Sequence, residues 1–547
     1  MLLLKIATVP VLADTTPDVD ALDDYARGRV AESDGAFTDA VAAYRQALAI
    51  DPQSPTIALR SYRQALEAGD FPLALQSAHI LDRAGALPPE GPLFLLADAL
   101  RAKRWDEADQ LNARIEKEQN FAFLTPIVRS WIAFGRDGEV AMPSADATRY
   151  GALTGRYLSE HLALQMLAKG RWEEAKTLLD DALALQPDGF PSLRLAAAAA
   201  LGADGQSDAA LATLPPDNRI FAIARADLAR GGKGRKIAKA QRVLTPAQGY
   251  ARLMSRLSVD LGVGNGKSIA VRAARIATFV DLASDGAKVN LARALQLAGR
   301  PEQALQELSS VPPASWSAPL GETVRIDALV DARQMETALA QAQALVAAPG
   351  AGTNEYLRLA EILSRNKDDK AAADMYRQAI AQTGDMKAPW TLHLLHGAAL
   401  EQAGRWQDAV TALETAARLA PDEPAVLNYL GYLQAERGVN LPAALAMLKK
   451  ASSLKPNDPA ITDSLGWAYF MSGDARVAVP LLQRAAAAAP DNGTIQEHLG
   501  DALWAAGRRF EARYAWEAAQ LVAESGDHER LKAKLNAGLA GTDNRRD

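Results

Sequence analysis

The sequence predicts an all-α protein in which short helical hairpins stack into a solenoid. Three observations lead to this fold. A set of landmark residues recurs about every 34 residues along much of the chain. Within each unit, apolar residues recur at helical spacing on two short segments. A Gly follows the first segment, and in most units a Pro follows the second. One hairpin cannot bury its apolar face alone, so neighbouring units must bury it together.

The most regular units lie between residues 390 and 526. Gly466 and Gly500 occupy the same place in consecutive units, and their separation is 34 residues. The clearest units share the same small residues, apolar positions and turn glycine, and they span 21–54, 156–189, 390–423, 424–458, 459–492 and 493–526. We expect about 12 to 15 units in all.

Each landmark has a physical role. Gly473, after the first segment of its unit, can adopt the left-handed conformation that ends a helix. Gly466 and Ala478 are small, and they allow the two helices of the hairpin to approach closely. Pro456 follows a second segment, where it cannot continue the helix. The pattern therefore predicts a helix-turn-helix unit.

Other parts of the chain keep fewer landmarks. The weaker units span 55–88, 89–121, 285–318, 319–352 and 353–386, and the segments 122–155 and 190–284 are the hardest to place in register. The predicted division is a truncated signal peptide and linker at 1–20, a first array at 21–389, regular units at 390–526, and a capping helix with a disordered tail at 527–547.

Composition excludes several classes of protein. Lys plus Arg number 60 and Asp plus Glu number 66, which gives a net charge of −6. This balance argues against a global nucleic-acid binder, which needs a strongly basic surface. The chain has no Cys, which excludes disulfides, thiolate metal sites and a lipid-modified cysteine in the sequence as given. No uncharged apolar run of about 18 residues occurs, so no transmembrane helix is expected.

The first thirteen residues, MLLLKIATVPVLA, resemble the end of a secretory signal with a truncated charged region. On this interpretation the mature protein is periplasmic or secreted. The alternative is a frayed segment before the first helix, which is compatible with a cytoplasmic protein.

Two features of the sequence resemble parts of enzyme sites. The run from Gly262 to Ser268, GVGNGKS, is one residue too short for a phosphate-binding loop and follows a helical pattern. It fits an inter-helix turn better, and nucleotide binding through Lys267 is the weaker alternative. His393 and His396 share a helix face, but no further metal ligands accompany them. We therefore predict a non-enzymatic protein with no cofactor and no metal.

The landmarks at 390–526 resemble those of the tetratricopeptide repeat. That resemblance implies a right-handed superhelix, in which the first helix of each unit lines a concave surface that binds peptides or proteins. The overall plan also resembles bacterial envelope proteins of this class, which include lipoprotein adaptors of carboxyl-terminal processing proteases. The missing Cys departs from the lipoprotein pattern.

Residues on the expected concave face are aromatic, acidic or amide-bearing. The candidates are Asn428, Tyr432, Asp463, Trp467, Phe470, Glu497, Asp501 and Trp504. Aromatic rings would supply buried contact area and the polar groups would orient a peptide, with the acids favouring Lys or Arg in the partner. The alternative is that Trp467, Phe470 and Trp504 only pack between units.

A basic segment at 225–242 carries seven positive residues and one Asp. It could meet an acidic partner or a membrane surface, although a solvated helix surface explains it more simply. The predicted function is a scaffold that binds other proteins or peptides, such as a periplasmic protease or an envelope complex, without nucleic acid. Peripheral membrane association stays open, and the main alternative is a cytoplasmic assembly or regulatory scaffold.

Overall fold

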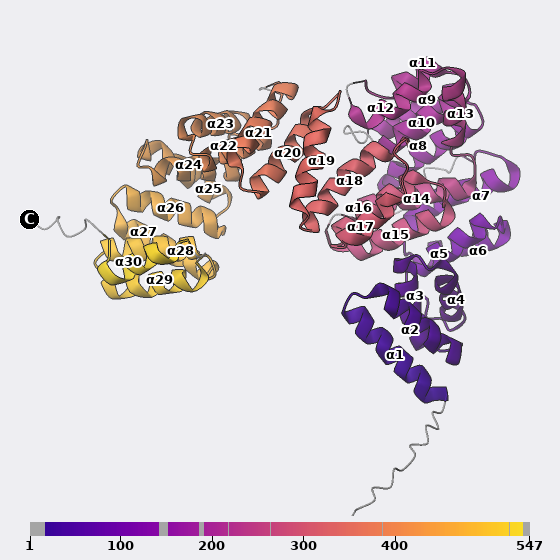
Figure 1. Ribbon diagram of the computed structural model, residues 1–547, viewed down its shortest axis with the longest axis horizontal. Coiled ribbons are helices and arrows are strands. Elements are labelled where there is room, and N and C mark those ends of the chain that lie inside the picture. The colour runs from indigo at the N-terminus through magenta and orange to yellow at the C-terminus, as the bar shows by residue number, and fades with distance from the viewer. Residues whose placement is uncertain are drawn as a thin grey trace, which may run out of the picture. The chain divides into compact units, whose positions relative to one another are not determined.

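The structure is a computed structural model. It describes residues 17–141, 151–184, 191–216, 218–262, 264–384, 387–523 and 526–539. Every regular element in these residues is a helix, which confirms the predicted all-α fold. The proposed signal segment lies outside the described residues. The chain divides into two compact units, which span 1–338 and 339–547, and each is considered separately (Figure 1).

The described residues of the first unit contain eighteen α-helices before the helix in which the boundary falls. They are α1 (Pro17–Ser33), α2 (Phe37–Ile50), α3 (Pro55–Ala68), α4 (Phe71–Arg83), α5 (Gly91–Arg101), α6 (Trp105–Glu118), α7 (Thr125–Asp137), α8 (Gly151–Ala168), α9 (Trp172–Ala184), α10 (Pro191–Ala203), α11 (Ser207–Ala212), α12 (Ala222–Leu228), α13 (Gly232–Ala240), α14 (Pro246–Leu261), α15 (Lys267–Val280), α16 (Asp285–Leu297), α17 (Pro301–Ser309) and α18 (Ala318–Asp331). Short 3-10 helices are η1 (Ala122–Leu124), η2 (Arg219–Phe221) and η3 (Gly264–Gly266).

The unit boundary falls within α19 (Met335–Ala347). The second unit continues with α20 (Thr353–Arg365), α21 (Asp369–Thr383), α22 (Trp390–Gln402), α23 (Trp406–Leu419), α24 (Pro424–Glu436), α25 (Leu441–Leu454), α26 (Pro459–Met471), α27 (Ala475–Ala488), α28 (Gly493–Ala505), α29 (Arg509–Val522) and α30 (His528–Ala537). The predicted start of the regular units at residue 390 coincides with the start of α22.

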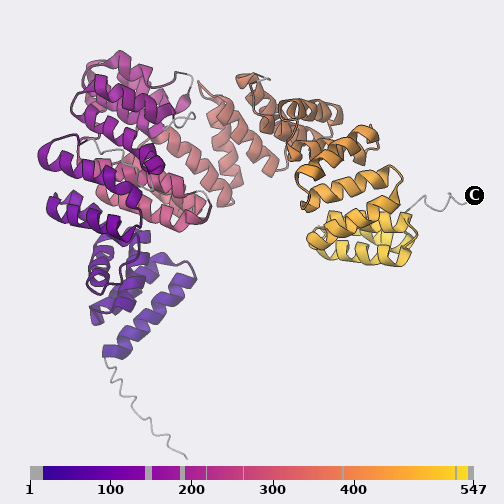
Figure 2. The ribbon, with the colours of Figure 1, turned by 180° about the vertical axis from the view of Figure 1, so that it is seen from behind.

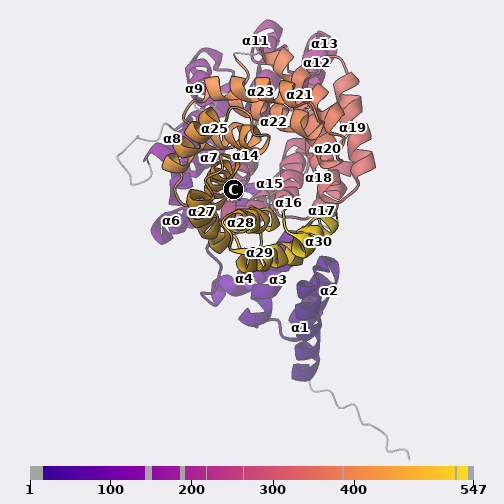
Figure 3. The same ribbon diagram turned by 90° about the vertical axis from the view of Figure 1, so that its left-hand side faces the viewer.

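Helices of the second unit pack as successive antiparallel pairs. From α20 to α29, each odd-numbered helix packs against the even-numbered helix before it, and α24, α26 and α28 also contact one another in order. The pairs follow one another along an arc (Figure 3). This is the solenoid of helical hairpins that the 34-residue period predicts.

The sequence sets the ends of these helices. Asp458 precedes α26, and its carboxylate accepts hydrogen bonds from the backbone N–H groups of Ala460 and Ile461. Such a cap satisfies donors that have no acceptor within the helix. Gly473 follows α26 with φ of +82°, the left-handed conformation expected for the residue that ends the helix.

Gly466 has a packing role inside α26. A Cβ atom at this position would lie 2.7 Å from Cγ of Leu482 on α27. Gly500 stands in the same relation to Trp516, at 2.3 Å from Nε1. Small residues at this place in the repeat therefore let a large side chain of the second helix seat against the first helix.

We expect Gly466→Ala to lower the free energy of unfolding of the second unit by about 1 kcal/mol or more, because the added Cβ overpacks the contact with Leu482. Gly155 on α8 is the matched control, since no atom lies within 4 Å of its Cβ position. There, Gly→Ala should stabilise by about 0.5–1 kcal/mol, as is usual within a helix. Urea unfolding measures both changes, and stabilisation by Gly466→Ala would contradict the packing role.

The hairpin of α14 and α15 departs from the simple stack. Its helices contact α3, α5, α7 and α8, which precede them by many residues in the chain. Figure 2 shows this hairpin lying against the earlier helices of the first unit. The hairpin is thus enclosed by its own unit, and α5 is buried along almost its whole length.

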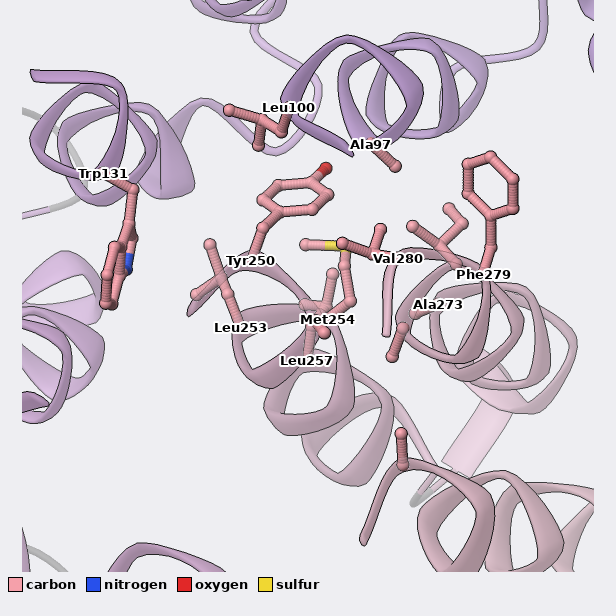
Figure 4. Packing of buried hydrophobic residues seen from close by; sticks show 14 of the residues in the cluster. Ala97, Leu100, Trp131, Tyr250, Leu253, Met254, Leu257, Ala273, Phe279 and Val280 are labelled. Atoms are coloured by element: carbon pink, nitrogen blue, oxygen red, sulfur yellow. The ribbon is translucent and has the colours of Figure 1, made fainter. Parts of the chain in front are cut away.

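Close contacts hold the hairpin in place (Figure 4). The Tyr250 hydroxyl donates a hydrogen bond to the carbonyl oxygen of Leu93, at 2.9 Å. Gly249 lies against the indole of Trp131, where a Cβ would come within 2.2 Å of a ring atom. Any larger side chain at Gly249 would push the hairpin away from α7.

Charged side chains also join α15, and Arg300 before α17, to the early helices. Glu67 on α3 accepts hydrogen bonds from Arg272 at 3.3 Å and from Arg300 at 2.7 Å. Arg272 also forms an ion pair with Glu90 at 2.8 Å, and Arg275 donates to the backbone carbonyl of Glu67 at 2.9 Å. The α14–α15 hairpin therefore packs against α3 and α5, and ion pairs with Glu67 and Glu90 help to hold α15 there.

Candidate functional site

The eight candidate residues lie on three first helices of the second unit. Asn428 and Tyr432 belong to α24, Asp463, Trp467 and Phe470 to α26, and Glu497, Asp501 and Trp504 to α28. Spacings of three and four residues place side chains on one side of a helix. Because α26 contacts both α24 and α28, side chains from the three helices can meet.

A continuous aromatic cluster joins the three helices. The rings of Trp467 and Phe470 stack with centroids 4.9 Å apart. The imidazole of His498, from α28, also stacks on the indole of Trp467. Their centroids are 4.0 Å apart and the interplanar angle is 19°. Tyr432 lies 6.1 Å from the same imidazole. Asp463 fixes the imidazole through a contact of 2.9 Å to its Nδ1.

We call the set Asn428, Tyr432, Asp463, Trp467, Phe470 and His498 the aromatic face. Three of its rings, those of Tyr432, Trp467 and Phe470, are half-buried, so part of each remains open to solvent. Sequence reasoning missed His498. The equivalent position one unit earlier is Ser464, so the repeat register gives no sign of an imidazole here.

Two polar atoms of the aromatic face lack hydrogen-bond partners. They are the indole Nε1 of Trp467, a donor, and the side-chain oxygen of Asn428, an acceptor, and both are shielded from solvent. Leaving a buried polar group unpaired costs about 1–3 kcal/mol. Both atoms would gain from a partner that reaches them.

Tyrosine hydroxyls beside the aromatic face remain protonated. Burial, with Glu436 and Asp463 nearby, raises the pKa of Tyr432, whose hydroxyl donates to Glu436 at 3.3 Å. Burial likewise raises the pKa of Tyr429, which donates to Glu401 at 3.4 Å. Carboxylates therefore border the aromatic face, and the hydroxyls act as donors at ordinary pH.

The two predicted acids of α28 are engaged by α30. The ammonium of Lys534 lies 2.6 Å from carboxylate oxygens of both Glu497 and Asp501. Arg530 also forms an ion pair with Glu497, and the indole of Trp516 donates to Asp501 at 2.9 Å. These acids are thus compensated by basic side chains of α30 in the same chain.

Trp504 is packed as well. Its ring lies 5.4 Å from that of Trp516, and the backbone of Gly538 is so close that a Cβ there would overlap it. Arg509 and Arg513 lie over the same ring, at 5.2 and 5.1 Å from its centroid. Trp504, Glu497 and Asp501 therefore form the seat of α30, and the aromatic face is the part of the candidate set that α30 does not occupy.

The glycine-rich turn joins two helices. It runs between α14 and α15 with η3 inside it, and Lys267 is exposed at the start of α15. A Cβ on Gly266 would lie 2.6 Å from the carbonyl oxygen of Leu261, so the turn folds tightly over the end of α14. A phosphate-binding loop follows a strand, and here a helix occupies that place.

The histidine pair His393 and His396 and the basic segment 225–242 lie in helical parts of the two units. Burial lowers the pKa of His396 to about 4, and no group of three or more potential metal ligands occurs in the described residues. In the basic segment, Arg225 and Arg235 donate to backbone carbonyls, whereas Lys233 and Lys236 are exposed. None of the described helices is long and apolar enough to span a membrane.

Comparison with known proteins identifies the repeats. The tetratricopeptide repeat family matches the chain at residues 20–55, 394–459 and 464–528. No curated protein matches the sequence. Solved structures with similarity include MamA from Desulfovibrio magneticus RS-1, at 18% identity over 31% of this chain and 94% of that chain, with a TM-score of 0.28. YrrB, a protein described as having an unusual peptide-binding site, has 19% identity over 31% of this chain and 86% of that one, with a TM-score of 0.28. The Cut9–Hcn1 hetero-tetramer of the APC/C has 13% identity over 95% of this chain and 96% of that chain, with a TM-score of 0.38.

Proposed function

We propose that this tetratricopeptide-repeat protein is a non-enzymatic scaffold that binds a segment of a partner protein on the aromatic face of its second unit. The observation that carries the proposal is the continuity of that face. Rings from α24, α26 and α28 touch across helix boundaries and remain partly open to solvent. Partly exposed aromatic clusters of this kind are typical of the central contacts of interfaces.

Unpaired polar atoms support a peptide as the occupant. A peptide backbone offers a carbonyl and an N–H at nearly every residue. The indole N–H of Trp467 matches the first and the amide oxygen of Asn428 matches the second, once the side chains over them move aside. Binding would then recover the cost of two unsatisfied groups.

The charges favour a partner segment that carries Lys or Arg. Glu401, Glu436 and Asp463 lie on or beside the aromatic face. At the neighbouring position, Lys534 already sits between two carboxylates of α28. One repeat earlier, the positions equivalent to Glu497 and Asp501 are Asp463 and Trp467, so a basic side chain of the partner would meet one carboxylate beside an indole ring.

Crosslinking followed by affinity capture of the full chain tests this function. The double variant Tyr432→Ala and Trp467→Ala removes two rings of the aromatic face. We expect capture of the specific partner to fall about thirtyfold or more, which corresponds to the loss of about 2 kcal/mol for one central aromatic contact. Circular dichroism checks that the helices remain folded.

The matched control removes two rings elsewhere in the second unit. Phe510 and Tyr514 lie on α29 and are 72% and 58% exposed. The variant Phe510→Ala and Tyr514→Ala should retain the partner. Retention of every partner by the aromatic-face variant would contradict the proposed site.

The cellular setting is a further part of the proposal. The signal-like segment at 1–13 supports export, and on that basis the scaffold serves envelope assembly or proteolysis in the periplasm. Fractionation of cells that produce the native protein tests this, and a strictly cytosolic pool would favour the cytoplasmic alternative.

A further inference from the structure

A cavity of about 270 Å³ lies in the first unit, apart from the aromatic face. One wall is the middle of α14, from Gln248 to Val259. Facing it are the N-terminal ends of three helices: Pro191 and Ser192 of α10, the 284–287 turn of α16, and Ser317 before α18. The first backbone N–H groups of a helix have no acceptor within it, and this end carries partial positive charge.

Side chains around the cavity add further donors. Ser255 is 7% exposed and lines the cavity, and its hydroxyl forms no hydrogen bond with a residue that the structure describes. Arg293, also on the wall, forms no ion pair with any described residue. Arg252 lies 3.1 Å from Glu160, yet its Nη2 has no acceptor. Ser255 and Arg252 thus have unused hydrogen-bonding capacity in the wall, whereas the guanidinium of Arg293 is exposed to solvent.

The acidic side chains of the wall are largely compensated. Glu160 is paired with Arg252, and Asp285 is paired with Lys288 at 3.2 Å. Asp281 is the exception, because burial raises its pKa and only weaker effects oppose that shift. The unpaired donors of Arg252 and Ser255, together with the guanidinium of Arg293, favour a hydrogen-bond acceptor with negative charge as the group that completes the wall.

An apolar surface completes the cavity. Trp316 is 2% exposed, and its indole N–H is held by Asp227 at 2.8 Å, so the ring is fixed in position. Leu195, Val259 and Leu320 line the same space. A cavity near the lower end of the usual size range, with convergent polar groups and an apolar wall, suits a small organic molecule.

We propose that this cavity binds a small organic oxyanion, namely a carboxylate carried on an apolar or aromatic body. The oxyanion accepts hydrogen bonds from Ser255 and from the guanidinium groups of Arg252 and Arg293, beside the helix ends. The body packs against Trp316 and Leu320. Asp281 opposes the bound charge and limits the affinity.

Ligand-detected NMR titration of the full chain with benzoate, at constant ionic strength, tests the proposal. We expect saturable binding that is at least tenfold stronger than that of benzyl alcohol, its neutral counterpart, and of inorganic phosphate, which has no apolar body. Equal binding of either comparison compound, or no saturable binding of benzoate, would overturn the proposal.

Two variants of opposite sign sharpen the test. Arg293→Gln removes a cation that has no ion-pair partner, so the fold should persist while benzoate binds about tenfold more weakly. Asp281→Asn removes the opposing charge and should strengthen binding severalfold. Arg136→Gln, on the exposed side of α7, is the control and should leave the affinity unchanged. Unaltered benzoate binding in both cavity variants would refute the assignment of the site.

Discussion

The Glu67→Gln variant is expected to destabilise the first unit by about 3 kcal/mol. Glu67 is 8% exposed, and its carboxylate compensates both Arg272 and Arg300. Removing one partner of a buried ion pair leaves uncompensated charge and typically costs about 3–5 kcal/mol. The lower end applies because Arg300 retains some contact with solvent. Hydrogen exchange of α3 and α15 should report the loss locally.

The control for this prediction is an exposed ion pair. Glu116 and Arg129 lie 2.7 Å apart, and about half of each side chain is exposed. Glu116→Gln should change stability by less than about 1 kcal/mol. Adding Arg300→Met to Glu67→Gln should recover part of the lost stability, since it removes a guanidinium that the first substitution leaves without its carboxylate. Equal effects of the Glu67 and Glu116 variants would show that the buried network contributes little.

Acid is expected to destabilise the first unit through His161. This imidazole on α8 is fully buried, and its Nδ1 accepts a hydrogen bond from the indole of Trp131 at 3.0 Å. Burial, together with the nearby positive charges of Arg252 and Arg256, lowers its pKa to about 3. The folded protein therefore holds this side chain neutral at pH values where the unfolded chain binds a proton.

The sign of the pH dependence follows from this difference. The contribution of the neutral His161 side chain to the free energy of unfolding is complete above the unfolded pKa of about 6.5. It is lost progressively as the pH falls toward the folded pKa of about 3. At pH 5 the loss is about 2 kcal/mol, at 1.36 kcal/mol per pH unit.

His161→Gln keeps a hydrogen-bond acceptor for Trp131 without a group that titrates in this range. Urea unfolding between pH 7 and pH 5 should therefore show a shallower decline for this variant than for the wild type. His79→Gln, at an exposed position on α4, should decline as the wild type does. Parallel pH profiles of the wild type and the His161 variant would contradict the prediction.

Much of the fold follows from local chemistry that a single sequence displays. The small residues at 466 and 500, the turn glycine at 473 and the cap at 458 each act within one hairpin. Their effects repeat with the period of the chain, so the pairs of the second unit could be placed by register alone. The position of the candidate side chains on first helices followed from the same register.

The docked hairpin could not be found in this way. Its contacts join α14 and α15 to helices far earlier in the chain, and no repeat register encodes such a pairing. One signal was present: α5 reads GPLFLLADALR, which is apolar on nearly every side and hence typical of a helix covered all round. That pattern predicts enclosure but does not say which segment provides it.

The seat of α30 shows a second limit. The acids at 497 and 501 were predicted to favour a basic partner, and the nearest basic groups belong to the chain itself, at 530 and 534. Charge complementarity was visible in the sequence. Which of two acidic positions, one repeat apart, the last helix would occupy depends on how the chain turns after α29, and residues 524–525 there lie outside the described part.

The enclosed hairpin also has a consequence for how the protein is made. An ordinary repeat array can fold outward from any starting point, because each unit needs only its neighbours. Here the Glu67 carboxylate meets Arg272, 205 residues later in the chain. At 5–20 residues per second, a ribosome needs roughly 10–40 s to cover that interval. During synthesis the apolar surface of α5 stays exposed to solvent until α14 and α15 have been made. The first unit should therefore complete its folding late and bind chaperones while the nascent chain grows.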